Sequence, residues 1–215
     1  YHIMHNDKLV QLSTGRIIAP VEYEFSKPEN DHAGYVSTVA YSDDNGYSWR
    51  RSANEVNLQD EGVEAQEPHV VELKDGRLLM LMRTYSGYVL KAYSSDCGTT
   101  WGPGIQVPEL RLPPHTSSAL CAKRIPATGD LLLLRCSGGP AEPFRWRTPF
   151  VSIISRDEGE TWANERVLMG APDNDYGYPS LTFVDDLALI SYHQRDGLHV
   201  LRVSTEWFYG QDAHG

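Results

Sequence analysis

An eight-residue pattern that occurs three times constrains the fold of this chain more than any other feature. The pattern Ser-x-Asp-x-Gly-x-[Ser/Thr]-Trp stands at residues 42–49, 94–101 and 155–162. Its Asp residues, at positions 44, 96 and 157, lie 52 and 61 residues apart. A pattern that recurs at such a period is typical of a repeat architecture, and the unit has about the length of one propeller blade.

Turn chemistry accounts for every fixed position of this pattern. The Asp carboxylate can accept backbone N–H groups within its own turn, and the Gly supplies a positive φ. The Ser or Thr hydroxyl adds a local hydrogen bond, and the Trp buries a large apolar surface. The pattern therefore identifies a fold and does not locate an active site. We expect three equivalent turns on the outer rim, with Trp49, Trp101 and Trp162 largely buried.

A simpler hairpin precedes each copy of the pattern, and a fourth hairpin follows the last copy. Short apolar strands flank turns at residues 13–15, 74–76, 128–130 and 185–186. Two hairpins per unit give four antiparallel strands, which is the content of a propeller blade. The sequence therefore predicts a single all-β domain, a β-propeller with about four blades. The expected blades are roughly 1–60, 61–111, 112–170 and 171–215.

Composition excludes several classes of partner. Among 215 residues, 19 Lys and Arg face 29 Asp and Glu, and the net charge is −10. Nucleic acid binding needs a basic surface, so we expect no nucleic acid partner. No apolar run approaches the ~18 residues of a membrane helix. The three Cys and eight His residues show no spacing typical of a metal site, so we expect neither a metal nor a cofactor.

The repeated motif is known as the Asp-box or BNR repeat, and further segments make the chain resemble the sialidase (neuraminidase) superfamily. Residues 67–83 resemble the central-blade segment of bacterial exo-sialidases, which a Glu opens and an Arg closes. Residues 147–150 and 176–181 resemble two later segments, in family order. The resemblance implies a six-bladed propeller. It also implies that this chain, with about four blades, corresponds to the C-terminal two-thirds of a longer protein.

By the same resemblance, Tyr178 is the catalytic nucleophile and Glu67 assists it, while Arg83 and Arg147 bind the substrate carboxylate. The chemistry is consistent, because arginine holds a carboxylate with two parallel hydrogen bonds. A neutral tyrosine also avoids repulsion by the carboxylate of a sialic acid, and sialidases are the glycosidases that use a tyrosine nucleophile. Each of these residues also fits an ordinary structural role. Arg145 remains an alternative to Arg147, and Tyr176 an alternative to Tyr178.

Two functional residues of the family pattern have no recognisable counterpart in this chain. It has no counterpart of the first-blade arginine motif and no assignable acid/base Asp, since Asp7, Asp31 and Asp60 lack a motif context. The expected activity is retaining hydrolysis of terminal sialic acid, or of a related acidic sugar, from glycans. The alternatives are a non-catalytic carbohydrate-binding propeller and a propeller glycosidase for another glycan.

Two further expectations concern partners and location. Open blade edges carry unpaired strand groups, so we expect self-association in addition to binding of a sialylated glycan or related carbohydrate. The first residues show no signal-peptide pattern, while the family resemblance favours a secreted or periplasmic location.

Overall fold

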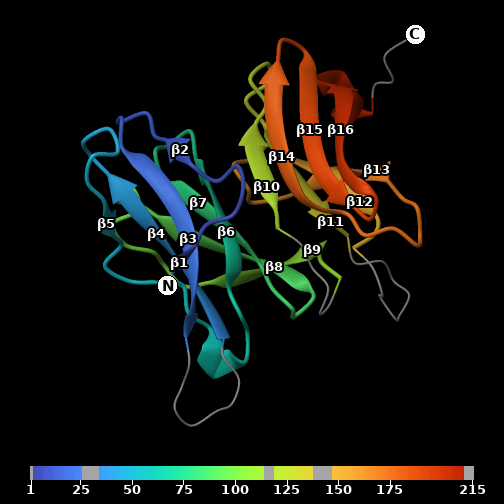
Figure 1. Cartoon of the computed structure of the whole chain (residues 1–215). Helices are drawn as coiled ribbons and strands as arrows, with labels where there is room; N and C mark the ends of the chain where they lie inside the picture. The colour runs from blue at the N-terminus through green and yellow to red at the C-terminus, as the bar shows by residue number, and fades with distance from the viewer. Residues whose placement is uncertain (1, 26–33, 114–118, 138–146, 211–215) are drawn as a thin grey trace.

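The computed structural model describes residues 2–25, 34–113, 119–137 and 147–210, which form four antiparallel sheets in chain order (Figure 1). The first sheet contains β1 (His2–Ile3), β2 (Val10–Gln11), β3 (Ile17–Phe25), β4 (Gly34–Ser42) and β5 (Arg50–Arg51). The second contains β6 (Gln66–Glu72), β7 (Leu78–Arg83), β8 (Tyr88–Ser94) and β9 (Ile105–Arg111). The third contains β10 (Cys121–Arg124), β11 (Leu131–Cys136), β12 (Phe150–Ser155) and β13 (Ala163–Met169). The fourth contains β14 (Gly177–Val184), β15 (Leu187–Gln194) and β16 (Gly197–Ser204).

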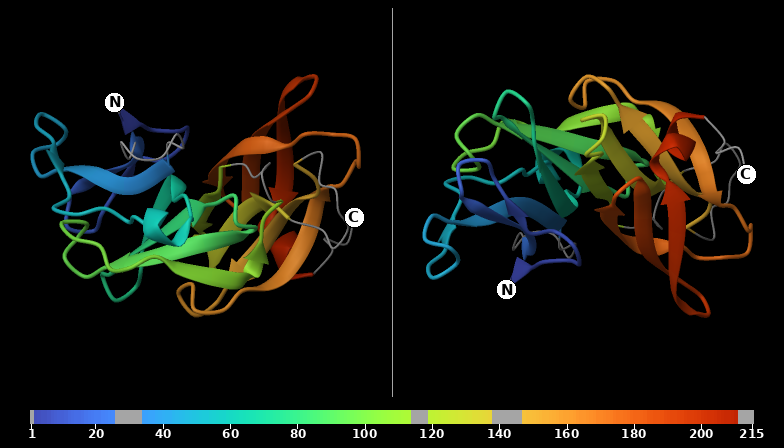
Figure 2. Two further views of the ribbon diagram at one scale, coloured as in Figure 1. Left: turned by 90° about the horizontal axis from the view of Figure 1, so that it is seen from below. Right: turned by 90° about the horizontal axis from the view of Figure 1, so that it is seen from above.

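The sheets are arranged as propeller blades, and the all-β prediction is confirmed. Strand β6 contacts β3 and β4 of the first sheet as well as β10 of the third, and β14 contacts β10 and β11. Figure 2 shows that the order of the sheets along the chain is also their order in space. The buried apolar residues form three clusters, each between two neighbouring sheets. Burial between neighbouring blades therefore supplies the core.

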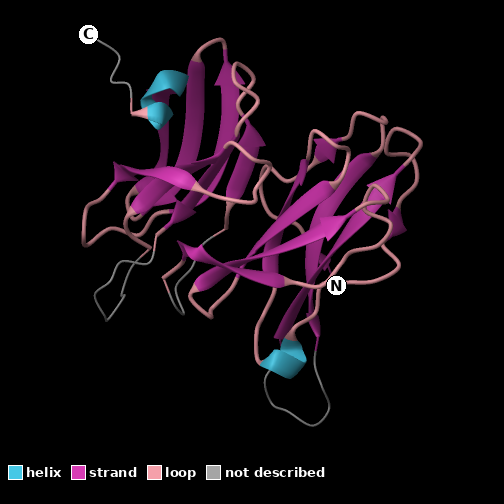
Figure 3. Cartoon of the chain, turned by 180° about the vertical axis from the view of Figure 1, so that it is seen from behind, coloured by secondary structure: helices cyan, strands magenta, loops and turns pink. Residues whose placement is uncertain are grey.

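Helical structure is minor in the described part of the chain. Two short 3-10 helices occur, η1 (Gln59–Glu61) and η2 (Thr205–Tyr209), which Figure 3 draws in cyan. Neither has the length or the apolar character needed to cross a membrane.

The segment before β2 lies between the first and the fourth sheet. The side-chain amide of Asn6 donates to the backbone oxygen of Tyr178 over 3.1 Å. The carboxylate of Asp7 accepts the backbone N–H of Leu181 over 2.9 Å and the hydroxyl of Ser180 over 2.9 Å. The first residues of the chain thus reach the inner strand of the last sheet, β14, which brings His5 and its neighbours into the centre of the arrangement.

The three Asp-box turns have the same local geometry, as the repeat predicted. In each turn the Asp carboxylate accepts the backbone N–H and the hydroxyl of the Ser or Thr four residues later, over 2.5–2.8 Å. The first Ser of each motif accepts the N–H of the motif Gly over 2.8–2.9 Å. Since all these partners lie within eight residues, the turn is determined locally.

The prediction that all three motif Trp residues are buried is wrong for Trp49. Trp101 is 4% exposed and Trp162 is 8% exposed, but Trp49 is 43% exposed. The second and third turns each pack on the preceding sheet, because a Cβ on Gly98 would meet Ile18, and one on Gly159 would meet Leu79. The first turn belongs to the first sheet, and no earlier sheet within the described residues covers it.

We expect this difference in burial to appear in stability. Trp101→Ala removes a large side chain from a packed site and should lower the free energy of unfolding by about 3–5 kcal/mol. Trp49→Ala should lower it by less than about 1 kcal/mol, as for most changes at exposed positions. Denaturant unfolding of the two variants beside the unmodified chain measures both values. Equal losses would mean that burial by the preceding sheet does not distinguish the two turns.

Candidate active site

Glu67 and Tyr178 occupy equivalent places in the second and fourth sheets. Each stands near the start of the innermost strand of its sheet, in a β-bulge where the pairing register shifts. Both have a positive φ, 48° for Glu67 and 52° for Tyr178, and a proline follows each. Such a conformation costs about 1–3 kcal/mol in a residue other than glycine, and bulges re-aim side chains next to active sites. The local backbone therefore marks both residues as candidates for function.

The repeat register places Arg83 and Glu22 in equivalent positions of adjacent sheets. Strand β3 of the first sheet and strand β7 of the second each follow the simple hairpin turn. Their first residues, Ile17 and Leu78, pair with the first Ser of the Asp-box in the same sheet. Five positions further along these strands lie Glu22 and Arg83. The second strands of neighbouring blades thus bring an acidic and a basic side chain to the same level of the propeller.

Glu67 is buried between charged partners. It is 1% exposed, and its Oε2 lies 2.9 Å from Nε of Arg83 in an ion pair. Its Oε1 lies 3.6 Å from Nε2 of His5, and its backbone N–H donates to the carboxylate of Glu22. Burial raises the pKa of Glu67 above the usual range, against the opposing effects of Arg83 and His5. A carboxylate whose pKa is raised toward neutrality is a better proton acceptor.

Tyr178 is half-buried and lies beside the side chains of Arg147 and His5. The guanidinium of Arg147 lies 5.4 Å from the centroid of its ring. The ring of His5 stacks on it with centroids 6.0 Å apart and an angle of 21° between the planes. His5 is therefore a neighbour of both Glu67 and Tyr178. The structure brings the four predicted site residues into one region, Glu67 with Arg83 and Tyr178 with Arg147, with His5 between the two pairs.

The two alternatives that the sequence left open differ in how far the structure describes them. Tyr176 is fully buried, packs on the rings of Phe150 and Tyr192, and accepts the backbone N–H of Ala171 at its hydroxyl. These contacts make Tyr176 a core residue, so Tyr178 is the better candidate for the nucleophile. Arg145 lies outside the described residues.

The three Asp residues without a motif context also differ in their surroundings. Asp7 accepts hydrogen bonds from Lys123, Ser180 and the backbone of Leu181. Although burial acts in the opposite direction, the hydrogen bonds from Lys123 and Leu181 lower the pKa of Asp7 below its usual range. An acid that stays ionised is a poor proton donor. Asp60 lies exposed on η1, and Asp31 lies outside the described residues.

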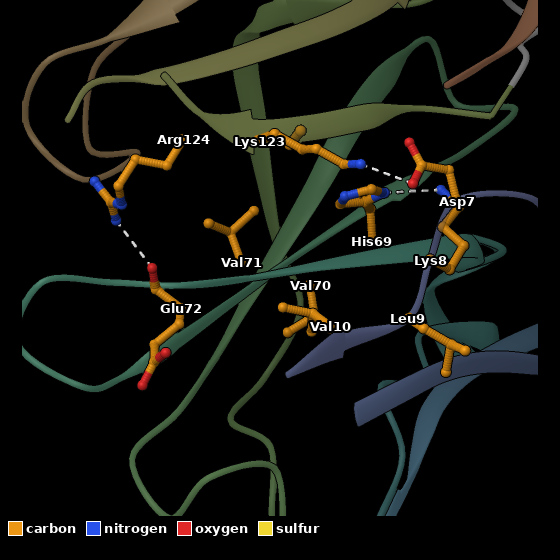
Figure 4. A pocket seen from close by; sticks show the side chains of 11 residues that line it. Asp7, Lys8, Leu9, Val10, His69, Val70, Val71, Glu72, Lys123 and Arg124 are labelled. Atoms are coloured by element: carbon orange, nitrogen blue, oxygen red, sulfur yellow. Dashed lines mark hydrogen bonds and ion pairs between the residues drawn. The ribbon is translucent and has the colours of Figure 1, made fainter. Parts of the chain in front are cut away.

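A cavity of about 280 Å³ lies between the segment at residues 7–10 and strands β6 and β10 (Figure 4). Its cationic groups already have partners, since Lys123 pairs with Asp7 over 2.7 Å and Arg124 pairs with Glu158 over 2.8 Å. Lys8 is buried, donates to the backbone oxygen of Leu120 over 2.7 Å, and has its pKa lowered to about 8 by burial. We assign this cavity a structural role along the inner strands.

Sequence reasoning missed Glu22 and His5. The repeat register contains a signal for Glu22, because counting five positions along the second strand leads to it as it leads to Arg83. His5 lies in a segment without a motif, and only the folded arrangement shows that it contacts Glu22, Glu67 and Tyr178.

The fold and the repeated turns define a propeller built from Asp-box blades, and comparisons with known proteins agree. The model of the BNR repeat-like domain matches residues 2–190. The chain therefore belongs to the BNR repeat-like domain family, and it is a sialidase-like member. It is 27% identical over 190 residues to a sialidase of Micromonospora viridifaciens. The aligned region covers 84% of this chain and 27% of the relative. It is 37% identical over 93 residues to a sialidase of Clostridium perfringens. This shorter aligned region covers 43% of this chain and 22% of the relative.

Solved structures show the same fold. A leech intramolecular trans-sialidase superposes with a TM-score of 0.72 at 22% identity, over 99% of this chain and 33% of the other. The intramolecular trans-sialidase of Ruminococcus gnavus superposes with a TM-score of 0.70 at 20% identity, over 99% of this chain and 46% of the other. The chain thus spans about a quarter of the length of the curated relatives, and a third to a half of these two structures.

Proposed function

We propose that this chain carries part of the active site of a sialidase-type glycoside hydrolase, within one propeller domain. In this proposal Tyr178 is the nucleophile, Glu67 the base, and Arg83 and Arg147 bind the carboxylate of a terminal sialic acid or a related acidic sugar. The observation that carries the proposal is the placement of Glu67, which is buried against Arg83 and shares the neighbour His5 with Tyr178.

The proposed reaction proceeds in two displacements at the anomeric carbon. The phenolic oxygen of Tyr178 attacks this carbon while its proton passes to Glu67, and the bond to the leaving oxygen breaks. A proton from a general acid completes the leaving alcohol. Water then attacks the same carbon and gives a proton to the conjugate base of that acid, while the bond to the Tyr178 oxygen breaks and this oxygen takes its proton back from Glu67. The two successive inversions retain the configuration. The raised pKa of Glu67 suits a residue that accepts and returns a proton.

Two arginines favour an acidic sugar over a neutral one. Arg147 lies over the ring of Tyr178 and Arg83 lies beside Glu67, so each of the two proposed reacting residues has a cationic neighbour that could bind a carboxylate next to the anomeric carbon. Two solved relatives of the fold bear on this choice: the leech enzyme is complexed with 2,7-anhydro-Neu5Ac, and a Trypanosoma rangeli sialidase is in complex with the inhibitor DANA.

The test is hydrolysis of an aryl α-sialoside by the purified chain, beside an aryl β-galactoside. We expect turnover of the sialoside alone. In Arg83→Lys, kcat/KM should fall about tenfold or more, because Lys keeps the positive charge beside Glu67 but cannot form two parallel bonds to a carboxylate. The matched control is Arg156→Lys, since Arg156 is an exposed arginine beside Asp130 and should leave the rate unchanged.

Each alternative function predicts another result in the same assay. Binding of sialic acid by calorimetry without any turnover would favour a non-catalytic carbohydrate-binding propeller. Turnover of the galactoside, with no effect of Arg83→Lys, would favour a glycosidase for a neutral glycan and would contradict the proposal.

A further inference from the structure

Two buried carboxylates turn one oxygen each toward the same imidazole nitrogen. Oε1 of Glu22 lies 3.0 Å from Nε2 of His5, and Oε1 of Glu67 lies 3.6 Å from the same nitrogen. His5, Glu22 and Glu67 each offer one ligand atom, and these three atoms lie within 4.8 Å of one another. The residues come from the segment before β2, from β3 and from β6, so it is the fold that makes them converge.

The second oxygen of each carboxylate is held by another group. Oε2 of Glu22 accepts the backbone N–H of Glu67, and Oε2 of Glu67 pairs with Arg83 over 2.9 Å. The ring of His5 stacks on Tyr178, which restrains its orientation. Partners that fix the outer atoms of carboxylate and imidazole ligands are typical of protein metal sites. With these restraints, Oε1 of Glu22 and Oε1 of Glu67 are the carboxylate oxygens that lie within 3.6 Å of Nε2 of His5.

We propose that His5, Glu22 and Glu67 form a three-ligand site for a divalent transition metal ion, of which Zn²⁺ is the best match. Imidazole nitrogen and carboxylate oxygen bind Zn²⁺ at about 2.0–2.2 Å, so ligand atoms of a tetrahedral site lie about 3.3–3.5 Å apart. The two separations from His5, 3.0 and 3.6 Å, bracket that value. Three protein ligands leave the fourth position of a tetrahedral ion for water or another small ligand.

The ligand set also predicts selectivity and access. Mg²⁺ and Ca²⁺ prefer six or more oxygen ligands, so a site with one imidazole and two carboxylates should favour Zn²⁺ over both. Glu22 and Glu67 are buried, whereas the His5 side chain is 19% exposed and provides the side from which an ion can enter. Arg83 offsets one of the two negative charges, so the affinity should be lower than that of a structural zinc site.

The competing arrangement needs no ion. In it the N–H of His5 is shared by the two carboxylates, and the cluster is a hydrogen-bonded support for Glu67. The two arrangements differ in a measurable way, because only the first binds Zn²⁺ stoichiometrically and only the first needs the lone pair of Nε2.

The experiment is calorimetric titration of the complete chain with Zn²⁺, and with Mg²⁺ for comparison. We expect one saturable Zn²⁺ site per chain and no comparable heat with Mg²⁺. His5→Phe keeps an aromatic ring on Tyr178 but removes the ligand nitrogen, so it should weaken Zn²⁺ binding at least about tenfold. Glu22→Gln should weaken it in the same direction. The matched control is His199→Phe, since His199 is a partly exposed histidine beside Asp196, away from His5, and should leave Zn²⁺ binding unchanged.

Thermal unfolding with and without Zn²⁺ gives a readout that does not depend on heat of binding. At one Zn²⁺ concentration the midpoint should rise in the unmodified chain and equally in His199→Phe, and should rise less in His5→Phe. No saturable Zn²⁺ binding by the unmodified chain would overturn the proposal and leave the shared hydrogen bond as the role of His5. Stoichiometric binding that persists in both His5→Phe and Glu22→Gln would overturn it as well, because the ion would then bind elsewhere.

Binding of Zn²⁺ has a consequence for the proposed hydrolysis, and this step rests on the proposed function. The ion would occupy Oε1 of Glu67, and a coordinated carboxylate is a weaker proton acceptor. Zn²⁺ should therefore inhibit sialoside hydrolysis in the unmodified chain and should inhibit His5→Phe at least about tenfold less, in line with the loss of affinity. The titration stands by itself: absence of hydrolysis would contradict the proposed function and leave the metal site tested by calorimetry.

Discussion

Tyr178→Phe is expected to lower kcat for an aryl α-sialoside by at least about 10³-fold, because the variant has no oxygen to form the glycosyl-enzyme bond and loss of a catalytic nucleophile can cost about 10⁶-fold. The phenyl ring preserves the stacking on His5 and the position under Arg147, so KM should change little. The matched control is Tyr176→Phe. The hydroxyl of Tyr176 accepts a partly buried hydrogen bond from the backbone N–H of Ala171, so this variant should lose about 0.5–1.5 kcal/mol of stability and keep its activity.

The double variant Tyr178→Phe, Glu67→Gln tests whether the two residues act as a unit. If Glu67 serves only to take the proton of Tyr178, its removal adds nothing once the hydroxyl is gone. The double variant should then be about as slow as the slower single variant, since effects within one catalytic unit are strongly non-additive. Losses that multiply would show that Glu67 and Tyr178 act independently. Full activity of Tyr178→Phe, with loss in Tyr176→Phe, would move the nucleophile to Tyr176.

The repeat made the fold predictable because each Asp-box turn closes on itself. In each motif the Asp, the first Ser, the Gly and the second hydroxyl residue are joined by hydrogen bonds within the motif, so the pattern specifies the geometry of the turn in all three sheets. The motif does not determine how deeply its Trp is buried. Trp49 and Trp101 have the same motif, but their burial depends on whether another sheet covers the turn, which the motif does not encode.

The candidate site was predictable to the extent that its residues stand in recognisable segments. Glu67 and Arg83 stand at the two ends of one hairpin. The structure shows an ion pair between them, with Nε of Arg83 2.9 Å from Oε2 of Glu67. Tyr178 could be separated from Tyr176 only when the structure showed that one is half-buried and the other a core residue. His5 could not be found from the sequence, because its partners Glu22 and Glu67 lie 17 and 62 residues further along the chain and meet it only through the packing of β3 on β6.

The leaving group should decide how well this chain by itself turns over a sialoside. Cleavage of an alkyl sialoside needs a proton on the leaving oxygen, whereas a phenolate with electron-withdrawing groups leaves without one. General acid assistance is worth about 10²–10⁴-fold. Neither Asp7 nor Asp60 suits this role, because Asp7 is kept ionised by Lys123 and its neighbours, and Asp60 lies exposed on η1.

We therefore expect the chain to hydrolyse a nitrophenyl α-sialoside at least about 10²-fold faster than a methyl α-sialoside, the lower end of the contribution of a general acid. Asp7→Asn and Asp60→Asn should leave the ratio of the two rates unchanged, even if Asp7→Asn lowers stability through the loss of its bond to Lys123. Rapid hydrolysis of the methyl sialoside would show that an acid lies within these 215 residues. A selective loss of that activity in one of the two variants would then identify it, because a missing general acid slows the poor leaving group far more than the good one.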